Sequence, residues 1–247
     1  VRGSDAMFYP PMSTKLEEWG VRTLQGFNAS HLDPEPDLVI VGNVVRRDNP
    51  EAVEMRRREL PYISMAEAIA EFMIRDTHAI VVAGTHGKTT TTALGAHVLM
   101  ATKQDPSYLV GGALVGYSES FRTSDGKEFI IEGDEYDTAY FDKGPKFRHY
   151  RAQTALITSL EFDHADIFDS VEDVEAAFGL LVESTAAHGH LVVSKSAPRA
   201  LKLIEALDFS GKVTTYSATD SSADYWAEDI RCLLYTSPSP RDNRDLV

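Results

Sequence analysis

A glycine-rich segment between an apolar run and a helix-like run constrains this chain more than any other feature. It reads Gly84-Thr85-His86-Gly87-Lys88-Thr89-Thr90, and it follows a run of β-branched and small apolar residues over 78–82. Residues 89–100 then have the composition of a helix. Strand, glycine turn and helix in that order form the unit from which parallel sheets with covering helices are built. We therefore expect an α/β fold with a mostly parallel sheet.

The same segment has the properties of a phosphate-binding loop. Glycines let consecutive backbone N–H groups turn toward phosphate oxygens, and the following helix N-terminus adds its positive end. Lys88 can reach the outer phosphates, and a threonine hydroxyl can bind magnesium. The segment departs from the full Walker A spacing because Val82 stands at the position of the first glycine. The alternative is an ordinary glycine turn with a solvated lysine, which the flanking strand and helix disfavour.

Two further polar motifs follow expected strands. The first is Ile130-Ile131-Glu132-Gly133-Asp134-Glu135-Tyr136-Asp137, and the second is Leu160-Glu161-Phe162-Asp163-His164-Ala165-Asp166. Parallel strands end at one edge of a sheet, where ligands bind in open α/β folds, and magnesium prefers one or two carboxylates plus substrate phosphates. Taken singly, the first motif could be a solvated acidic loop and His164 an ordinary surface residue. Three such motifs in strand order favour one shared site.

Charge and composition exclude several classes of function. The 247 residues include 24 Lys and Arg against 38 Asp and Glu, a net charge of −14. That balance argues against affinity for nucleic acid or for anionic membranes through basic residues. The longest apolar stretches are far shorter than the ~20 residues of a membrane-spanning helix. The one cysteine, Cys232, cannot form an internal disulfide, which fits a cytoplasmic protein.

The remaining chain continues the alternation of strands and helices. A capping box of Ser13-Thr14 with Glu17 predicts a helix through Trp19. The final stretch, 233–247, has two prolines and no apolar periodicity, so we expect a disordered or artefactual tail. Strands are expected at 1–4, 37–41, 108–110, 129–132, 154–158, 191–194 and 213–216, and helices at 50–59, 65–74, 171–183 and 198–207.

Three of these segments together resemble the Mur ligase family, ATP-dependent amide-forming enzymes of bacterial cell-wall synthesis. They are GTHGKTTTT, IEGDEYDTAYFDKGPKFRHY and LEFDHADIFDSVEDV, and the segments GSDAMFYPPMST and GNVVRRDNPE resemble the family's nucleotide-sugar domain. The resemblance implies a Rossmann-like UDP-sugar-binding domain over 1–76 that lacks its first strand. It also implies an incomplete central P-loop ATP-binding domain over 77–232. We expect the tail to lie outside the family and the C-terminal ligase domain to be absent.

The resemblance also implies site residues and cofactors, ATP and Mg²⁺. Thr89 and Glu132 would bind a first magnesium ion, and His164 would help to place a second. The residues implied to bind ATP are Gly84, Thr85, His86, Gly87, Lys88, Thr89 and Thr90, and those implied in catalysis are Lys88, Glu132 and His164. Ser4 and Asp5, at the end of a strand, would contact the uridine part of a UDP-sugar.

The reaction implied by the resemblance is amide formation in the cytoplasm. ATP would phosphorylate the lactyl carboxylate of UDP-N-acetylmuramate, and an amine would attack the acyl phosphate. The amine expected from the motifs is that of the murein tripeptide L-alanyl-γ-D-glutamyl-meso-diaminopimelate, in peptidoglycan recycling, and the isolated chain would be inactive. Two alternatives stay open: L-alanine as the amino substrate, or a nucleotide-binding module without ligase activity. Neither nucleic acid nor membrane is an expected partner.

Overall fold

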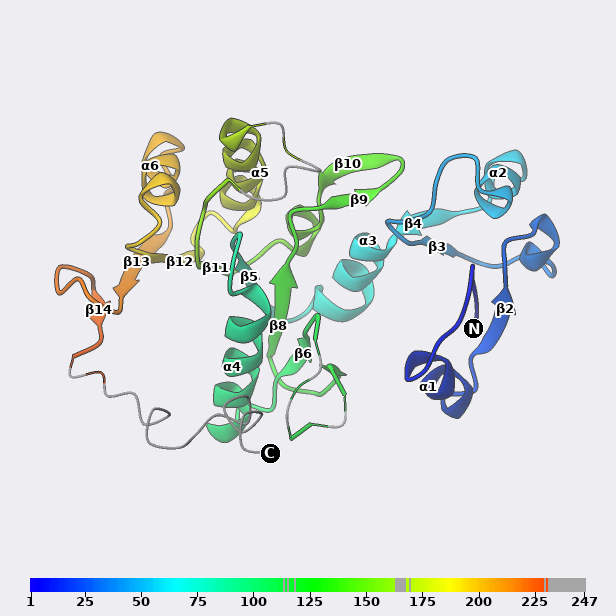
Figure 1. The fold of residues 1–247 in the computed structure, drawn as a ribbon, viewed down its shortest axis with the longest axis horizontal. Helices are drawn as coiled ribbons and strands as arrows, with labels where there is room; N and C mark the ends of the chain where they lie inside the picture. Colours follow the sequence, from blue (N-terminus) through cyan, green and yellow to red (C-terminus); the bar gives the residue numbers. More distant parts are fainter. Residues whose placement is uncertain are drawn as a thin grey trace, which may run out of the picture.

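The computed structural model separates the chain into an N-terminal part with two small sheets and a larger part built on one sheet (Figure 1). It describes residues 1–112, 114, 116–117, 119–162, 168, 170–228 and 230. Both parts alternate strands with helices along the chain, and the sheets are mostly parallel. The expected α/β class is confirmed. No described helix is both long and apolar enough to cross a membrane.

The N-terminal part contains two parallel strand pairs. Strand β1 pairs with β2, and β3 pairs with β4. A small core of Leu32, Val41, Met55 and Leu60 lies beneath the second pair. The elements are β1 (Arg2–Asp5), α1 (Met12–Glu18), β2 (Arg22–Gln25), a 3-10 helix (Ala29–Leu32), β3 (Val39–Val41), α2 (Pro50–Arg57) and β4 (Tyr62–Ser64).

Local sequence signals explain most helix starts, with one exception in this part. Asn49 caps α2 and Pro50 occupies its first turn, while Ser64 and Glu67 form a capping box at α3 (Met65–Ile69). The capping box expected at Ser13-Thr14 is wrong. Helix α1 begins at Met12, so Ser13 and Thr14 lie within its first turn and not before it. Among the described residues, no side chain caps this helix.

The larger part is built on an eight-stranded sheet of order β14-β13-β12-β11-β5-β8-β6-β7. All neighbouring strands are parallel except β6 and β7. The bounds are β5 (His78–Ala83), β6 (Ser107–Leu109), β7 (Phe121–Arg122), β8 (Glu128–Gly133), β11 (Thr154–Ile157), β12 (His190–Ser194), β13 (Lys212–Ser217) and β14 (Tyr225–Trp226). A separate hairpin joins β9 (Asp137–Ala139) to β10 (Asp142–Pro145).

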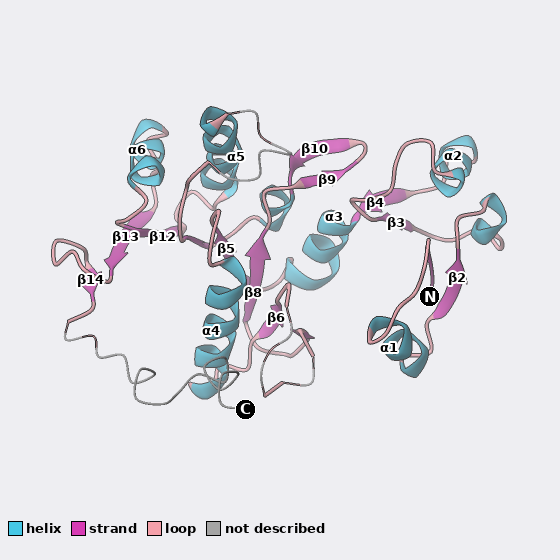
Figure 2. Cartoon of the chain, in the orientation of Figure 1, coloured by secondary structure: helices cyan, strands magenta, loops and turns pink. Residues whose placement is uncertain are grey.

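Helices cover both faces of this sheet (Figure 2). On one face, α4 (Lys88–Ala101) packs Ala96 against Val82 and Ile130 of the strands. On the other face the core includes Phe147, Phe178 and Ile204. It is formed by α3 with its π-helical continuation (Ala70–Ile74), the 3-10 helix Lys146–Tyr150, α5 (Val171–Ser184) and α6 (Pro198–Ala206).

Strand β5 lies at the point where the chain changes direction across the sheet. From β5 the chain passes through α4 to β6 and β8 on one side, and later reaches β11 and β12 on the other side. The strands beside β5 are held in register, with Val82 opposite Glu132 and Leu156 opposite Val82. Ligands of open α/β sheets bind outside the carboxyl ends of the strands at such a point. The loop after β5 occupies that position.

His190, at the start of β12, lies at the opposite edge and gives the fold a pH dependence. Burial and then Lys212 lower the pKa of His190, whose Nε2 lies 2.8 Å from Thr214 Oγ1. The folded state therefore favours neutral imidazole, and its contribution is lost as pH falls below the ordinary value near 6.5. We expect His190→Gln to flatten the fall in melting temperature between pH 7 and 5. An unchanged slope by calorimetry would contradict this.

Candidate active site

The loop after β5 turns through a conformation that requires glycine at its first position. Gly84 has a φ of +143°, and a Cβ built there would lie 2.0 Å from Thr158 Oγ1 and 3.0 Å from the Ser159 nitrogen. Gly87 precedes α4 with a φ of +80°. Val82, where the full Walker A spacing has a glycine, is a core residue of β5 with no exposed surface. Val82 in place of a glycine therefore leaves the turn from Gly84 to Gly87 unchanged.

The end of β11 fixes the loop through a set of hydrogen bonds. Thr158 Oγ1 donates to the His86 carbonyl at 2.6 Å, and Ser159 Oγ accepts from the His86 N–H at 2.9 Å. The hydroxyl oxygens of Ser159 and buried Thr85 lie 2.9 Å apart. The sequence analysis did not identify Thr158 and Ser159 as contacts of the loop. The one available signal was their position at the end of an expected strand.

Lys88 begins α4 and points back across the loop. Its Nζ donates to the Gly84 carbonyl at 2.7 Å and to Glu135 Oε1 at 2.9 Å. The Glu135 side chain is fully buried, whereas 15% of the Lys88 side chain is exposed. Glu135 was part of an acidic motif in the sequence, but its pairing with Lys88 was not predicted. The pair places a positive group on the loop with one carboxylate behind it.

Thr89 and Glu132, the two predicted ligands of a first magnesium ion, are brought together. Thr89 Oγ1 donates to Glu132 Oε2 at 3.0 Å, and the Gly111 N–H donates to Glu132 Oε1 at 2.5 Å. Two neighbouring ligands of octahedral Mg²⁺ lie ~2.9 Å apart, which this oxygen pair matches. A Cβ at Gly111 would come within 3.2 Å of the carboxylate, and one at Gly112 within 3.1 Å of Thr89 Cγ2. The residues present fit a magnesium ion that also binds phosphate oxygens.

The remaining predicted site residues are His86, Thr90 and His164. His86 is exposed, and its Nε2 lies 3.9 Å from Glu161 Oε2. Thr90 is exposed on the first turn of α4. His164 lies outside the described residues. Within the residues that are described, no three His, Cys, Asp or Glu side chains gather, so a magnesium ion at Thr89 and Glu132 would depend on phosphate oxygens for its other ligands.

Ser4 and Asp5 lie at the end of β1, in the N-terminal part. Ser4 Oγ donates to Glu51 Oε2, and Glu51 Oε1 also accepts from the Asn28 N–H at 3.1 Å. His31 Nδ1 lies 2.7 Å from the same oxygen. Asp5 is exposed. Glu51, Asn28 and His31 were not identified as contacts of Ser4: Glu51 lies in the segment GNVVRRDNPE, but neither that segment nor the sequence around Asn28 and His31 indicates a pairing with β1.

Two sets of contacts join the N-terminal part to the larger sheet. Lys15 pairs with Glu119, and the ring of Trp19 packs edge-on against Phe121 at 5.4 Å. On the other side, Arg56 donates to the Tyr140 hydroxyl at 2.6 Å. These contacts come from α1 and α2 on one part and from β7 and the β9–β10 hairpin on the other. They hold α1 and α2 of the N-terminal part against the larger part.

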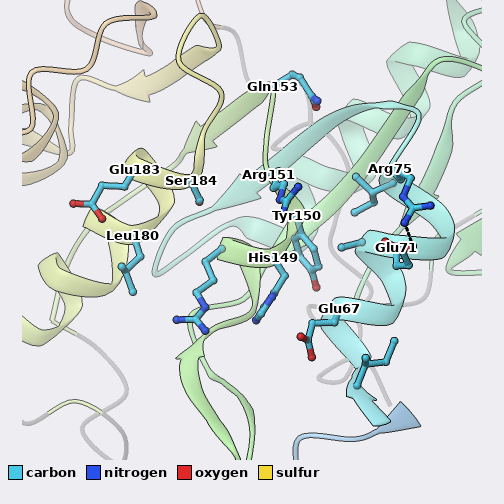
Figure 3. Close-up of a pocket in the computed structure, with 14 residues that line it drawn as sticks. Glu67, Glu71, Arg75, His149, Tyr150, Arg151, Gln153, Leu180, Glu183 and Ser184 are labelled. Carbon is cyan, nitrogen blue, oxygen red and sulfur yellow. Dashed lines mark ion pairs between the residues drawn. The ribbon is translucent and has the colours of Figure 1, made fainter. Parts of the chain in front are cut away.

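A groove of about 920 Å³ lies away from these residues, between α3 with its π-helical turn and α5 (Figure 3). It includes residues that precede β5 and β11, so it lies toward the opposite edge of the sheet from the loop. Arg148 and His149, on its floor, both contact Asp142. Burial alone would raise the pKa of Asp142, but the Gly144 N–H, His149 and Arg148 together lower it. Because the groove lies toward the opposite edge of the sheet, it takes no part in the site around Lys88.

Comparison with known protein families gives two adjacent matches. Residues 1–77 match the description "Mur ligase family, catalytic domain", and residues 82–235 match "Mur ligase middle domain".

Curated relatives include two bacterial enzymes with the same name, UDP-N-acetylmuramate–L-alanyl-gamma-D-glutamyl-meso-2,6-diaminoheptandioate ligase. The Escherichia coli protein is 42% identical over 78% of this chain and 42% of its own length. The Haemophilus influenzae protein is 41% identical over 82% of this chain and 44% of its own length. A UDP-N-acetylmuramate–L-alanine ligase of Nocardioides is 37% identical over 90% of this chain and 48% of its own length. The chain thus spans less than half the length of these relatives.

Solved structures agree with these matches. The UDP-N-acetylmuramate:L-alanyl-gamma-D-glutamyl-meso-diaminopimelate ligase from Neisseria meningitides superposes with a TM-score of 0.83 at 36% identity, over 91% of this chain and 74% of that chain. A murein peptide ligase from Psychrobacter arcticus superposes with a TM-score of 0.82 at 35% identity, over 94% of this chain and 51% of that chain.

Proposed function

Since this chain belongs to the Mur ligase family, we propose that it forms the ATP-binding and UDP-sugar-binding part of a murein tripeptide ligase. The reaction would join L-alanyl-γ-D-glutamyl-meso-diaminopimelate to UDP-N-acetylmuramate in the cytoplasm, with ATP as phosphoryl donor. The tripeptide is favoured over L-alanine because the relatives named for it are more similar, at 41–42% against 37% identity. The observation that carries the proposal is the pairing of Thr89 with Glu132 beside Lys88.

Each of these side chains would have a separate task. Among the described residues, no side chain caps the N–H groups at the start of α4, so they would be available to phosphate oxygens together with the helix dipole. Lys88 would neutralise charge on the transferred phosphoryl group. Thr89 and Glu132 would hold magnesium, which supplies further positive charge to the phosphates when it is bound. His164 would assist a second ion, and His86 and Thr90 would line the nucleotide.

The N-terminal part would bring the acceptor to this loop. Ser4 and Asp5 lie at the carboxyl end of β1, where a parallel sheet presents its ligands, and they would contact the uridine portion. The contacts of Lys15 with Glu119 and of Arg56 with Tyr140 would then hold the bound UDP-sugar at a constant distance from the phosphates.

Calorimetric titration of the chain with ATP, with and without Mg²⁺, tests the nucleotide site. We expect Thr89→Val to reduce the gain in ATP affinity that Mg²⁺ confers by about tenfold, because one oxygen ligand of the ion is lost. Affinity without Mg²⁺ should stay within about twofold of wild type. Thr90→Val is the comparison on the next residue: since Thr90 would line the nucleotide, any loss of ATP affinity should be equal with and without Mg²⁺, and the gain from Mg²⁺ should be kept. A loss of that gain in Thr90→Val alone would show that the wrong threonine is assigned.

The amino substrate is tested with a longer protein that carries this chain and a C-terminal ligase domain. Phosphate release from ATP should require Mg²⁺, UDP-N-acetylmuramate and the tripeptide together. Release with free L-alanine and none with tripeptide would favour the alanine ligase instead. No release with either, combined with intact ATP binding, would favour a nucleotide-binding module without ligase activity.

A further inference from the structure

One strand end supplies a carboxylate to each of two consecutive residues at the start of α4. Glu132, the next-to-last residue of β8, accepts a hydrogen bond from Thr89. Glu135, two residues beyond the strand, accepts one from Lys88. The two carboxylates differ in surroundings, because Glu132 is half-buried and the Glu135 side chain has no exposed surface. A magnesium site explains Glu132. Nothing in that site explains a buried carboxylate behind the lysine.

Burying a carboxylate is costly unless it is paired and hydrogen-bonded, and an apolar side chain at that position would avoid the cost. Lys88 Nζ lies 2.9 Å from both Glu135 oxygens. An ammonium group has three donors, and here two of them are directed to fixed acceptors, the Gly84 carbonyl and Glu135. The contact therefore determines where the third donor lies and lowers the positive charge that the loop presents.

We propose that Glu135 is a positioning residue for Lys88, which fixes the ammonium group in the loop and competes with nucleotide phosphate for its charge. The inference rests on the proposed function, since it assumes that the loop binds phosphate. Its consequence is that the loop without nucleotide holds a partly neutralised lysine. Nucleotide phosphate then binds more weakly than an unpaired lysine would allow, which favours release of the product nucleotide.

The decisive variant is Glu135→Gln, which keeps the size and an acceptor oxygen but removes the charge. We expect it to bind ATP with Mg²⁺, and inorganic triphosphate with Mg²⁺, about three- to tenfold more tightly than wild type, because a negative charge beside the phosphates is gone. Glu135→Asp retains the charge and should return the affinity toward wild type. A residue with a merely structural role would not give tighter binding, because loss of local order weakens binding.

Asp134→Asn is the matched control. Asp134 precedes Glu135 in the chain and pairs with Lys146 at 2.6 Å, away from the loop lysine. Its neutralisation changes the net charge equally, and we expect an effect within about twofold. Titration calorimetry of the four proteins, with circular dichroism to establish folding, gives the comparison.

The outcomes separate this inference from the proposed function. Unchanged or weaker binding in folded Glu135→Gln, or the same gain in Asp134→Asn, would overturn the role of Glu135 while the nucleotide site stands. No binding of ATP or triphosphate by the wild-type chain would instead overturn the proposed site itself.

Discussion

Replacing Lys88 by alanine is expected to weaken ATP–Mg²⁺ binding at least about 100-fold, since hydrogen bonds to charged groups contribute ~1.5–3 kcal/mol each and the Lys88 ammonium lies on the loop itself. The substitution also removes the partner of buried Glu135. An uncompensated buried charge costs ~3–5 kcal/mol, so the melting temperature should fall as well. Calorimetric titration measures the first effect, and thermal unfolding measures the second.

The double variant Lys88→Ala with Glu135→Gln separates the two effects. It contains no uncompensated charge, so its melting temperature should recover most of the loss while its ATP binding stays as weak as in Lys88→Ala. Unchanged ATP affinity in folded Lys88→Ala would refute the phosphate-binding interpretation of the loop.

Replacing Gly84 by alanine is expected to destabilise the chain by about 3 kcal/mol or more, from backbone strain together with overpacking. The new Cβ would meet Thr158 Oγ1 at 2.0 Å and the Ser159 backbone at 3.0 Å, and the backbone cannot yield without breaking the contacts to His86. At ~2–4 °C per kcal/mol for a chain of this size, the melting temperature should fall by ~6–12 °C. ATP binding should weaken in parallel.

Gly3→Ala is the matched control, because a Cβ at Gly3 would meet nothing within 4 Å and its φ lies outside the left-handed region. Its melting temperature should stay within about 2 °C of wild type. A second comparison uses Thr158→Ala in the Gly84→Ala background, which removes the closest atom. Partial recovery is expected, and no recovery would show that the backbone contact dominates.

The elements around the loop could be predicted because their signals are local. A strand was expected over 78–82 and a helix over 89–100, and the structure has β5 at His78–Ala83 and α4 at Lys88–Ala101. The β9–β10 hairpin was missed, since its sequence is rich in acids and ends in Gly144 and Pro145, which are poor strand formers. Its stability comes from contacts such as Thr138 Oγ1 to the Gly144 carbonyl at 2.8 Å.

The candidate site could also be predicted only in part: the sequence indicated where each motif lies, but not which side chains pair. Each motif could be placed at a strand end, so the approach of Thr89 to Glu132 followed from the expectation of parallel strands. The partners of Lys88 and His86, Glu135 and Ser159, did not follow from that expectation, although both also lie just beyond strand ends. Which side chain of an acidic motif turns inward depends on strand pairing and burial. Neither is encoded in the motif itself.

The pairing of β5 with β8 has a consequence for how this site can fail. Side chains alternate between the two faces of a strand, so a shift of one residue would exchange Glu132 with Ile131 beside Thr89. Glu132, the proposed magnesium ligand, would then be buried in the core, and an apolar side chain would lie beside Thr89. Core residues such as Val81 and Ile131, which touch no substrate, therefore keep the ligand on the correct side. Mutations that shift this pairing would therefore disrupt the proposed magnesium site although they alter none of its residues.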